Sequence, residues 1–187
     1  MGADEQLERL RRDVRYLMDR QEILDCIARH ARGHDRHDVD LLSSAYHQDG
    51  VDEHGYAINP GPKYAEWANA VHTAGSRLHL HNISTHICEI AGDVAHCETY
   101  VLVGLLNNDE TSARLINGRY IDRLERRNGE WKIALRRSTV DLLISGDASI
   151  LKAPMFIRQG YVKGMQDKRD LCYQRPLTLD ETPADRW

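Results

Sequence analysis

Histidine is the residue type best able to do chemistry in this chain, because ten of its 187 residues are histidines. Two groups of histidines lie close together in the sequence: His30, His34 and His37 beside Asp35, and then His79, His81 and His86. Imidazole exchanges protons near neutral pH and also binds metal ions. Each group therefore allows acid–base catalysis, metal binding or a simple solvated surface.

Asp35 and His81 are candidates for a catalytic His–Asp pair. A carboxylate bonded to one imidazole nitrogen fixes the tautomer and leaves the other nitrogen free to take a proton from a substrate. The alternative is a metal site, because His79 and His81 lie two residues apart and would share one face of a strand. No compact set of carboxylates or cysteines completes the coordination, so we predict no metal and no other cofactor.

Other familiar catalytic and binding motifs are missing from the sequence. The four cysteines (Cys26, Cys88, Cys97 and Cys172) form no Cys-x-x-Cys pair, so neither a disulfide framework nor a zinc ribbon is expected. The sequence also lacks a Gly-x-Ser-x-Gly elbow, a Gly-x-Gly-x-x-Gly fingerprint and a Walker loop. Hydrolase, dinucleotide-binding and phosphoryl-transfer functions are therefore not supported.

Three helices are expected to position the first group of histidines. Residues 4–32 carry apolar side chains at spacings of three and four, which predicts a long amphipathic helix. We expect Gly33 to end this helix and Asp38 to cap a short second one, so that Asp35 lies in the junction between them. A third helix is predicted after the turn that begins at Asn59.

Four long strands are expected to follow these helices. The segments rich in β-branched and aromatic residues are 77–90, 94–106, 113–127 and 130–144. The pair Asn128-Gly129 is a strong signal for a type I′ hairpin turn, because both residues tolerate a positive φ. The order of elements predicts an α+β fold with an antiparallel sheet, which on curling would enclose a pocket against the helices.

The length fits one domain, which we place at residues 1–145. Residues 146–187 are interrupted by Pro154, Pro176 and Pro183, and we expect this extension to cover the pocket or a subunit contact. Arg136 and Arg137 are neighbours on the last long strand and must point to opposite faces of the sheet. We expect Arg136 to enter the pocket, and Arg137 to be solvated or paired with an acid from residues 38–110.

The charge and hydropathy exclude several classes of partner. The net charge is -4, so no general basic surface is available to bind nucleic acid. The densest apolar stretch, residues 100–106, is far shorter than the roughly 20 residues that cross a bilayer, which predicts no membrane partner. Without an apolar secretory signal at the N-terminus, the expected location is cytoplasmic.

Three segments together resemble the SnoaL-like family of the nuclear transport factor 2 (NTF2-like) superfamily. They are the run from Ala31 to Leu42 with Gly-His-Asp-Arg-His-Asp at its centre, the strand opening His81-Asn-Ile-Ser-Thr followed by Ala91-Gly-Asp-Val-Ala, and the hairpin from Gly118 to Arg137. The resemblance covers roughly residues 5–145. It implies an NTF2-like cone, in which a curved antiparallel sheet wraps around N-terminal helices and encloses a pocket.

The resemblance also implies a chemistry. The similar enzymes are hexachlorocyclohexane dehydrochlorinase, bile acid 7α-dehydratase and scytalone dehydratase, which are cofactor-free lyases with a His–Asp dyad. Matched by motif, the dyad implied here is His81 as base and Asp35 as its carboxylate. His30 and Arg136 would donate hydrogen bonds to the leaving group. The expected substrate-pocket residues are Tyr46, Trp67 and Tyr100.

We therefore expect a cofactor-independent lyase that acts on a small apolar, cyclic or aromatic substrate. The group eliminated would be water, halide or a small carbonyl fragment such as formaldehyde. An isomerase or cyclase on the same fold would use the same pair of residues. A non-catalytic small-molecule-binding module would keep the cone without needing the dyad.

The last long strand also bears on assembly. The alternation of Ile133 and Leu135 with Ala134 and Arg136 places apolar side chains on both faces of the strand. A bare apolar outer face normally marks an interface. We expect a homo-oligomer, a trimer before a dimer, formed through the outer face of the sheet as the resemblance implies.

Overall fold

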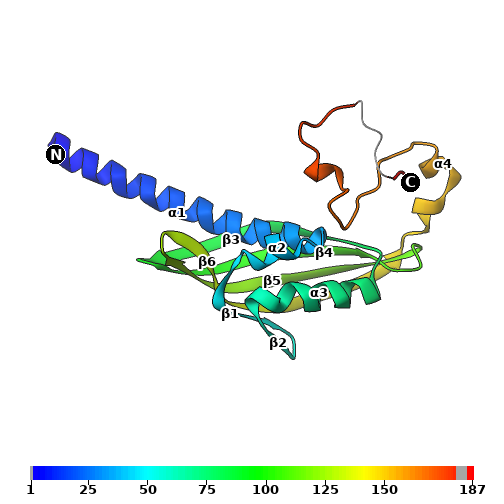
Figure 1. The fold of residues 1–187 in the computed structure, drawn as a ribbon, viewed down its shortest axis with the longest axis horizontal. Coiled ribbons are helices and arrows are strands. Elements are labelled where there is room, and N and C mark those ends of the chain that lie inside the picture. Colours follow the sequence, from blue (N-terminus) through cyan, green and yellow to red (C-terminus); the bar gives the residue numbers. More distant parts are fainter. Residues whose placement is uncertain (1, 180–184) are drawn as a thin grey trace.

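The computed structural model describes residues 2–179 and 185–187, and it consists of helices lying on one face of a curved sheet (Figure 1). The helices of this layer are α1 (Ala3–Asp35), α2 (Val39–Ser43) and α3 (Gly61–Gly75). The strands are β1 (Tyr46–His54), β2 (Ala57–Pro60), β3 (Leu78–Ala91), β4 (Val94–Leu106), β5 (Ser112–Arg127) and β6 (Glu130–Asp147). This arrangement confirms the α+β, NTF2-like architecture.

Helix α1 is longer than the sequence pattern predicts, and its N-terminal half projects beyond the sheet (Figure 1). Gly33 was expected to end the helix, but it lies within it. A Cβ atom at this position would lie 2.6 Å from the backbone nitrogen of Leu42, so glycine here permits close packing of α1 against α2. The helix ends at Asp35, which is its last residue and not part of a junction.

The short connection after α1 follows the prediction. The Asp38 side chain accepts a hydrogen bond from the backbone N–H of Leu41, at 3.2 Å, and so caps α2. The predicted third helix is α3, which packs Tyr64, Ala65 and Ala68 into the core.

The sheet contains two strands that the sequence did not predict. Its order is β2-β1-β6-β5-β4-β3, and β1 runs parallel to β6 while the remaining neighbours are antiparallel. The sheet is therefore mixed, whereas an antiparallel one was expected. The four long strands were predicted within a few residues of their observed ends, and Asn128 and Gly129 both adopt positive φ (55° and 84°) in the turn between β5 and β6.

The hydrophobic core lies between the helices and the concave face of the sheet. It includes Ile23, Cys26 and Ile27 of α1, Leu42 of α2, and Leu124 and Ile133 of the central hairpin, all fully buried. The apolar side chains nearer the start of α1, including Leu10 and Leu17, are instead exposed. Within the described residues, no helix is both long enough and apolar enough to cross a membrane.

The extension after β6 begins with the short helices η1 (Ser149–Lys152) and α4 (Pro154–Ile157) and later forms η2 (Leu171–Tyr173). It returns to the end of α1, where Lys168 and Tyr173 both bond a carboxylate oxygen of Asp38, at 2.6 and 2.7 Å. The Gln166 amide approaches Nδ1 of His79 to 2.6 Å. The extension thus contacts the elements that carry both histidine groups. Residues 180–184, which include Pro183, lie outside the described residues.

Candidate functional site

The structure brings Asp35 and His81 together. Nδ1 of His81 lies 2.6 Å from a carboxylate oxygen of Asp35, and the backbone N–H of His81 donates to both oxygens of the same carboxylate, at 3.0 and 2.9 Å. Both side chains are largely buried, with exposed fractions of 5% for His81 and 11% for Asp35. An imidazole held in this way carries its proton on Nδ1, which donates it in a hydrogen bond to Asp35, and leaves Nε2 free to accept a proton.

The pair depends on contact between the end of α1 and the start of β3. Asp35 is the last residue of α1, and the backbone bonds from His81 attach its carboxylate to the strand. The ring of His81 shares the inner face of β3 with His79, as the alternation of side chains requires. The Asp35 carboxylate therefore holds His81 at two points, its backbone N–H and the Nδ1 atom of its ring.

A cavity of about 300 Å³ lies beside His81 on the concave face of the sheet. Its walls are partly apolar and partly polar, and the residues that line it are His54, Gly55, His72, His81, Val101, Val103, Ile116, Gly118, Tyr120, Ser138, Thr139 and Val140. A second, more polar hollow of about 400 Å³ lies on the α1 side of the pair and includes Arg32 and Arg36. The first cavity has the apolar walls expected around a small cyclic molecule.

Arg136 and His30 lie behind this cavity and do not line it. Arg136 is fully buried and donates two hydrogen bonds to Asp122, at 2.8 and 2.7 Å, while its third donor group lies 2.8 Å from Nδ1 of His30. Its guanidinium lies 3.8 Å from the centre of the Tyr120 ring. The expectation that Arg136 and His30 bond a leaving group directly is therefore corrected: both residues support the cavity wall. Arg137 points to the other face and pairs with Glu53, as predicted.

The three expected pocket residues also lie outside the cavity lining. Tyr46 is buried behind it, where its hydroxyl donates to Asp52 at 2.6 Å and lies 3.1 Å from Nε2 of His30. Trp67 packs its ring against His54, with ring centres 5.7 Å apart, and so reaches the cavity through a neighbour. Tyr100 is on the outer face of the sheet and is 40% exposed, because the inner-face positions beside it on β4 belong to Thr99 and Val101.

Tyr120 is a cavity residue that the sequence analysis missed. It is one of the residues that line the cavity. Burial raises the pKa of Tyr120 above its ordinary value, despite the opposing charge of Arg136, so the hydroxyl stays protonated. Tyr120 therefore contributes a protonated hydroxyl to the layer of residues that lines the cavity.

The buried carboxylates Asp52 and Asp122 were also missed. Asp122 lies directly opposite Arg136 in the β5–β6 pairing, but only because the register shifts between Arg123 and Leu124, so counting from the hairpin turn does not lead to it. Asp52 is fully buried on β1, a strand that the sequence did not predict, and one of its carboxylate oxygens has no hydrogen-bond partner among the described residues. These two groups make the layer behind the cavity acidic around Arg136.

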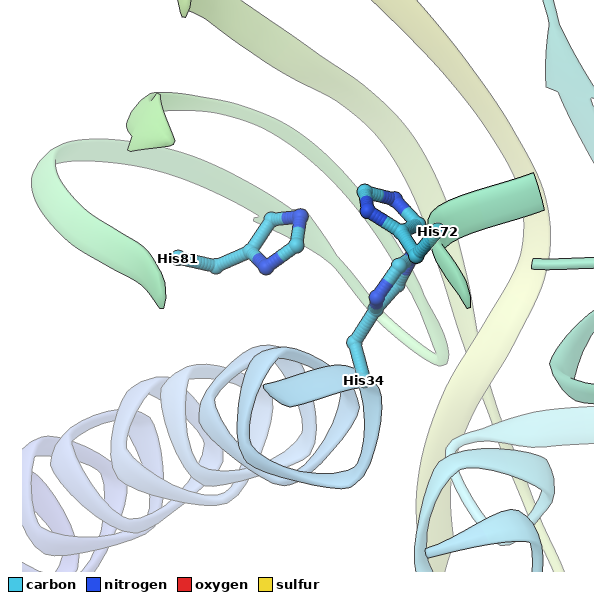
Figure 2. Close-up of side chains that lie close together, drawn as sticks. All are labelled: His34, His72 and His81. Carbon is cyan, nitrogen blue, oxygen red and sulfur yellow. The ribbon is translucent and has the colours of Figure 1, made fainter. Parts of the chain in front are cut away.

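Two further histidines lie against the His81–Asp35 pair. Figure 2 shows His34 from α1 and His72 from α3 with their rings turned toward the ring of His81. The ring centres of His34 and His81 are 4.3 Å apart, and those of His34 and His72 are 4.6 Å apart. Burial, together with the neighbouring histidines, lowers the pKa of His72 to about 2 and holds that of His34 well below its ordinary value. Both rings are therefore neutral at neutral pH.

From the sequence, His79 was considered as a possible metal ligand beside His81, but the ring of His79 is bonded to protein groups. Its Nε2 lies 2.9 Å from the carbonyl oxygen of His34, and its Nδ1 is the atom that Gln166 approaches. Burial lowers the pKa of His79 to about 4, although the bond to the His34 carbonyl opposes this. Both ring nitrogens of His79 are thus occupied by protein groups.

The arrangement can therefore supply a base, a fixed proton on the far side of that base, and at least one neutral donor. The base is Nε2 of His81 and the fixed proton lies between Nδ1 and Asp35. The donor is the hydroxyl of Tyr120, which lines the same partly apolar cavity. Such a site is suited to removing a proton from a substrate while stabilising charge that develops elsewhere in it.

Comparison with known proteins places this site in a family context. Residues 15–137 match the family model described as a SnoaL-like domain. This range contains both members of the His81–Asp35 pair and the cavity residues up to β6. No curated protein matches the sequence significantly.

Several solved structures share the fold. A hexachlorocyclohexane dehydrochlorinase from Novosphingobium barchaimii superposes with a TM-score of 0.67 at 22% identity, covering 72% of this chain and 94% of the other. A scytalone dehydratase-like protein from Novosphingobium aromaticivorans gives 0.62 at 16% identity, covering 69% and 88%. A protein of unknown function from Mycobacterium tuberculosis gives 0.60 at 25% identity, covering 75% and 77%.

Proposed function

Since the chain belongs to the SnoaL-like domain family, we propose that it is a cofactor-independent lyase that acts on a small, largely apolar cyclic or aromatic molecule. The observation that carries the proposal is the bond between His81 and Asp35 at the edge of a cavity of about 300 Å³. Two of the proteins with the same fold bear the names of elimination enzymes, a dehydrochlorinase and a dehydratase. Their names suggest the class of reaction to test first.

In the proposed reaction, Nε2 of His81 takes a proton from a carbon atom of the substrate. The electron pair of that C–H bond forms a carbon–carbon double bond, and the group on the adjacent carbon leaves with its own bonding pair. Asp35 stabilises the imidazolium that His81 becomes, and it keeps the ring in the tautomer that has Nε2 free. Halide would leave as the anion, and His81 would then lose its extra proton to solvent; hydroxide would take up the proton that His81 carries and leave as water, which returns the imidazole to its neutral form.

Tyr120 is the group we propose to stabilise the departing atom. Its hydroxyl is protonated and the residue lines the cavity, where burial strengthens a hydrogen bond to developing negative charge. Arg136 assists from behind the ring, since its guanidinium is 3.8 Å from the ring centre and Asp122 holds it there. Arg136 thus acts through Tyr120 and does not need to touch the substrate.

The same residues would also serve cleavage of a carbon–carbon bond. His81 would then remove the proton of a hydroxyl group, the C–C bond would break to give a small carbonyl product such as formaldehyde, and the released carbanion would be protonated. Tyr120 would stabilise the electron-rich fragment. Product analysis separates this reaction from elimination of water or halide.

The test begins by identifying small molecules that the purified protein retains, using mass spectrometry. These molecules are then tested one by one as substrates, alongside hexachlorocyclohexane, scytalone and their hydroxylated and halogenated cyclic relatives. A product lighter than its substrate by water, hydrogen halide or a carbonyl fragment supports a lyase. A product of unchanged mass would instead establish an isomerase or cyclase, and retention without any turnover would establish a binding module.

A further inference from the structure

The three histidines in Figure 2 form a cluster whose members come from different elements and whose ring nitrogens converge. One nitrogen from each of His34, His72 and His81 lies within 4.8 Å of the other two. We propose that these histidines bind a divalent transition-metal ion such as Zn²⁺, and that the bound ion inhibits the lyase by occupying Nε2 of His81. The inhibitory part rests on the function proposed above, whereas the binding part does not.

The spacing of the nitrogens fits such an ion after small rotations of the rings. Zinc binds imidazole nitrogen at about 2.0–2.1 Å, so two nitrogens of one tetrahedral site lie roughly 3.3 Å apart. The observed nitrogens lie within 4.8 Å of one another, so ion binding requires each pair to close by at most about 1.5 Å. Three imidazoles with one position left open is also a common zinc coordination in proteins.

His72 supplies an observation that points to a missing ligand. Its Nδ1 is buried and has no hydrogen-bond partner among the described residues. A buried polar atom without a partner is costly, and a metal ion bound through Nδ1 of His72 would satisfy it. The His72 ring also lines the cavity, so an ion can reach it from the side on which a substrate would enter.

His34 can contribute a lone pair with little loss of bonding. Its Nε2 lies 3.2 Å from the hydroxyl of Tyr64, and its Nδ1 lies 3.4 Å from Nε2 of His79. Nε2 of His79 already donates to the carbonyl oxygen of His34 at 2.9 Å. Its longer contact with Nδ1 of His34 is therefore the weaker of the two. A metal ion bound through Nδ1 of His34 would replace only this weak contact.

Asp35 completes the arrangement from outside the cluster. Histidines that bind metal ions generally donate their other ring N–H to a carboxylate or carbonyl group, which orients the ring and makes the ligating nitrogen more basic. Nδ1 of His81 donates to Asp35 in this way. The bond that prepares His81 to take a proton therefore also prepares it to bind a metal, and the two events compete for Nε2.

The binding test uses Zn²⁺ and Co²⁺ as probes with the full chain and no substrate. We expect calorimetry to show one Zn²⁺ per chain, and Co²⁺ to give the visible absorption bands of a tetrahedral nitrogen site. His72→Gln should weaken Zn²⁺ binding by at least about tenfold, given that even second-layer changes cost 10 to 100-fold. His96→Gln is the matched control, because His96 is an exposed histidine outside the cluster.

A competing site exists and gives a distinguishable signal. His86, Cys88 and Cys97 also have ligand atoms within 4.8 Å of one another. Binding there would add a strong sulfur-to-cobalt charge-transfer band in the near ultraviolet and would be lost in Cys88→Ala and kept in His72→Gln. That result, or no saturable binding by the native protein, would overturn the proposal.

Inhibition is measured separately once a substrate is available. Zn²⁺ should lower turnover over the same concentration range in which calorimetry shows binding, and a chelator should restore it. Turnover that rises with Zn²⁺, or does not change while the cluster is filled, would refute the inhibitory part. An error in the proposed lyase function would give a different result. In that case the metal-free His81→Gln variant would turn the substrate over at an undiminished rate.

Discussion

The guanidinium of Arg136 and the carboxylate of Asp122 form an ion pair joined by two hydrogen bonds, and neither side chain is exposed to solvent. The two residues are direct partners on β6 and β5. Arg136 also contacts His30 and lies over the ring of Tyr120, so the pair connects the central hairpin with α1 and with the cavity wall. The position of the Tyr120 hydroxyl thus depends on a charge pair that the substrate never touches.

Removal of one partner of this pair should destabilise the protein strongly. Asp122→Ala leaves the Arg136 charge buried without its carboxylate, which we expect to lower the free energy of unfolding by about 3–5 kcal/mol. Replacing both residues by apolar ones, as in Asp122→Leu with Arg136→Met, should restore much of that loss. Urea unfolding of the native protein and the two variants tests this prediction. A loss below about 1 kcal/mol in Asp122→Ala would show that the pair is not buried as described.

The carboxylate of Asp19 should make stability depend on acid pH. Burial alone would raise its pKa, but hydrogen bonds from Trp131 and Arg15 and the charge of Arg126 outweigh burial and lower it. A carboxylate whose pKa is lower in the folded than in the unfolded chain stabilises the fold fully above the unfolded value, near 4. That contribution disappears as the pH falls through the folded pKa.

Asp19→Asn should therefore lower the free energy of unfolding by about 1–3 kcal/mol at pH 7, because charged hydrogen bonds to Trp131 and two arginines are weakened. The difference between variant and native protein should narrow as the pH falls below about 4. Urea unfolding at a series of pH values between 3 and 7 measures it. A difference that stays constant across this range would contradict the assigned cause.

Gly33 should resist substitution although it lies within a helix. Alanine is favoured over glycine in helices by about 1 kcal/mol, but here the added Cβ would lie 2.6 Å from the backbone of Leu42. We expect Gly33→Ala to destabilise the protein by about 1–3 kcal/mol, as overpacking does. Gly146→Ala is the control, because no atom lies within 4 Å of the Cβ position there. Thermal unfolding of both variants shows whether α1 and α2 pack this closely in solution.

The outer face of the sheet carries an exposed apolar row that we propose as the contact between copies of the chain. Leu80, Gly104, Leu115 and Ile144 are successive partners across β3, β4, β5 and β6. The three large side chains of this row are about half exposed. Light scattering should give the mass of an oligomer, a trimer before a dimer, and Leu115→Lys should lower it. A native mass near that of one 21.4 kDa chain would disprove the assembly.

The sequence predicted the four long strands because they are rich in β-branched residues and are separated by recognisable turns. It did not predict β1, whose residues Tyr46–His54 are mostly polar and whose parallel pairing with β6 joins segments far apart in the chain. Gly33 misled the prediction of the helix end, since glycine both ends helices and permits close packing. Both errors turn on a tertiary contact that local patterns do not reveal: β1 pairs with a strand far along the chain, and Gly33 packs against Leu42 of the next helix.

In the candidate site, too, local sequence patterns do not predict the features that depend on contacts between separate elements. The pairing of Asp35 with His81 came from family resemblance, because nothing local connects two residues that are 46 positions apart. Counting outward from the turn at Asn128 and Gly129 would pair Arg136 with Ile121. A register shift in the β5–β6 pairing places Asp122 opposite Arg136 instead. Side-chain directions such as that of Tyr100 depend on register in the same way.

The measurement that tests the account most directly is the turnover of His81→Gln with an identified substrate, beside Asp35→Asn and the control His96→Gln. If His81 is the base that Asp35 orients, the first two variants should lose at least about 100-fold in turnover while their unfolding temperatures and folds stay close to native. The control should retain native turnover. A folded His81→Gln variant that turns the substrate over at a near-native rate would contradict the central claim.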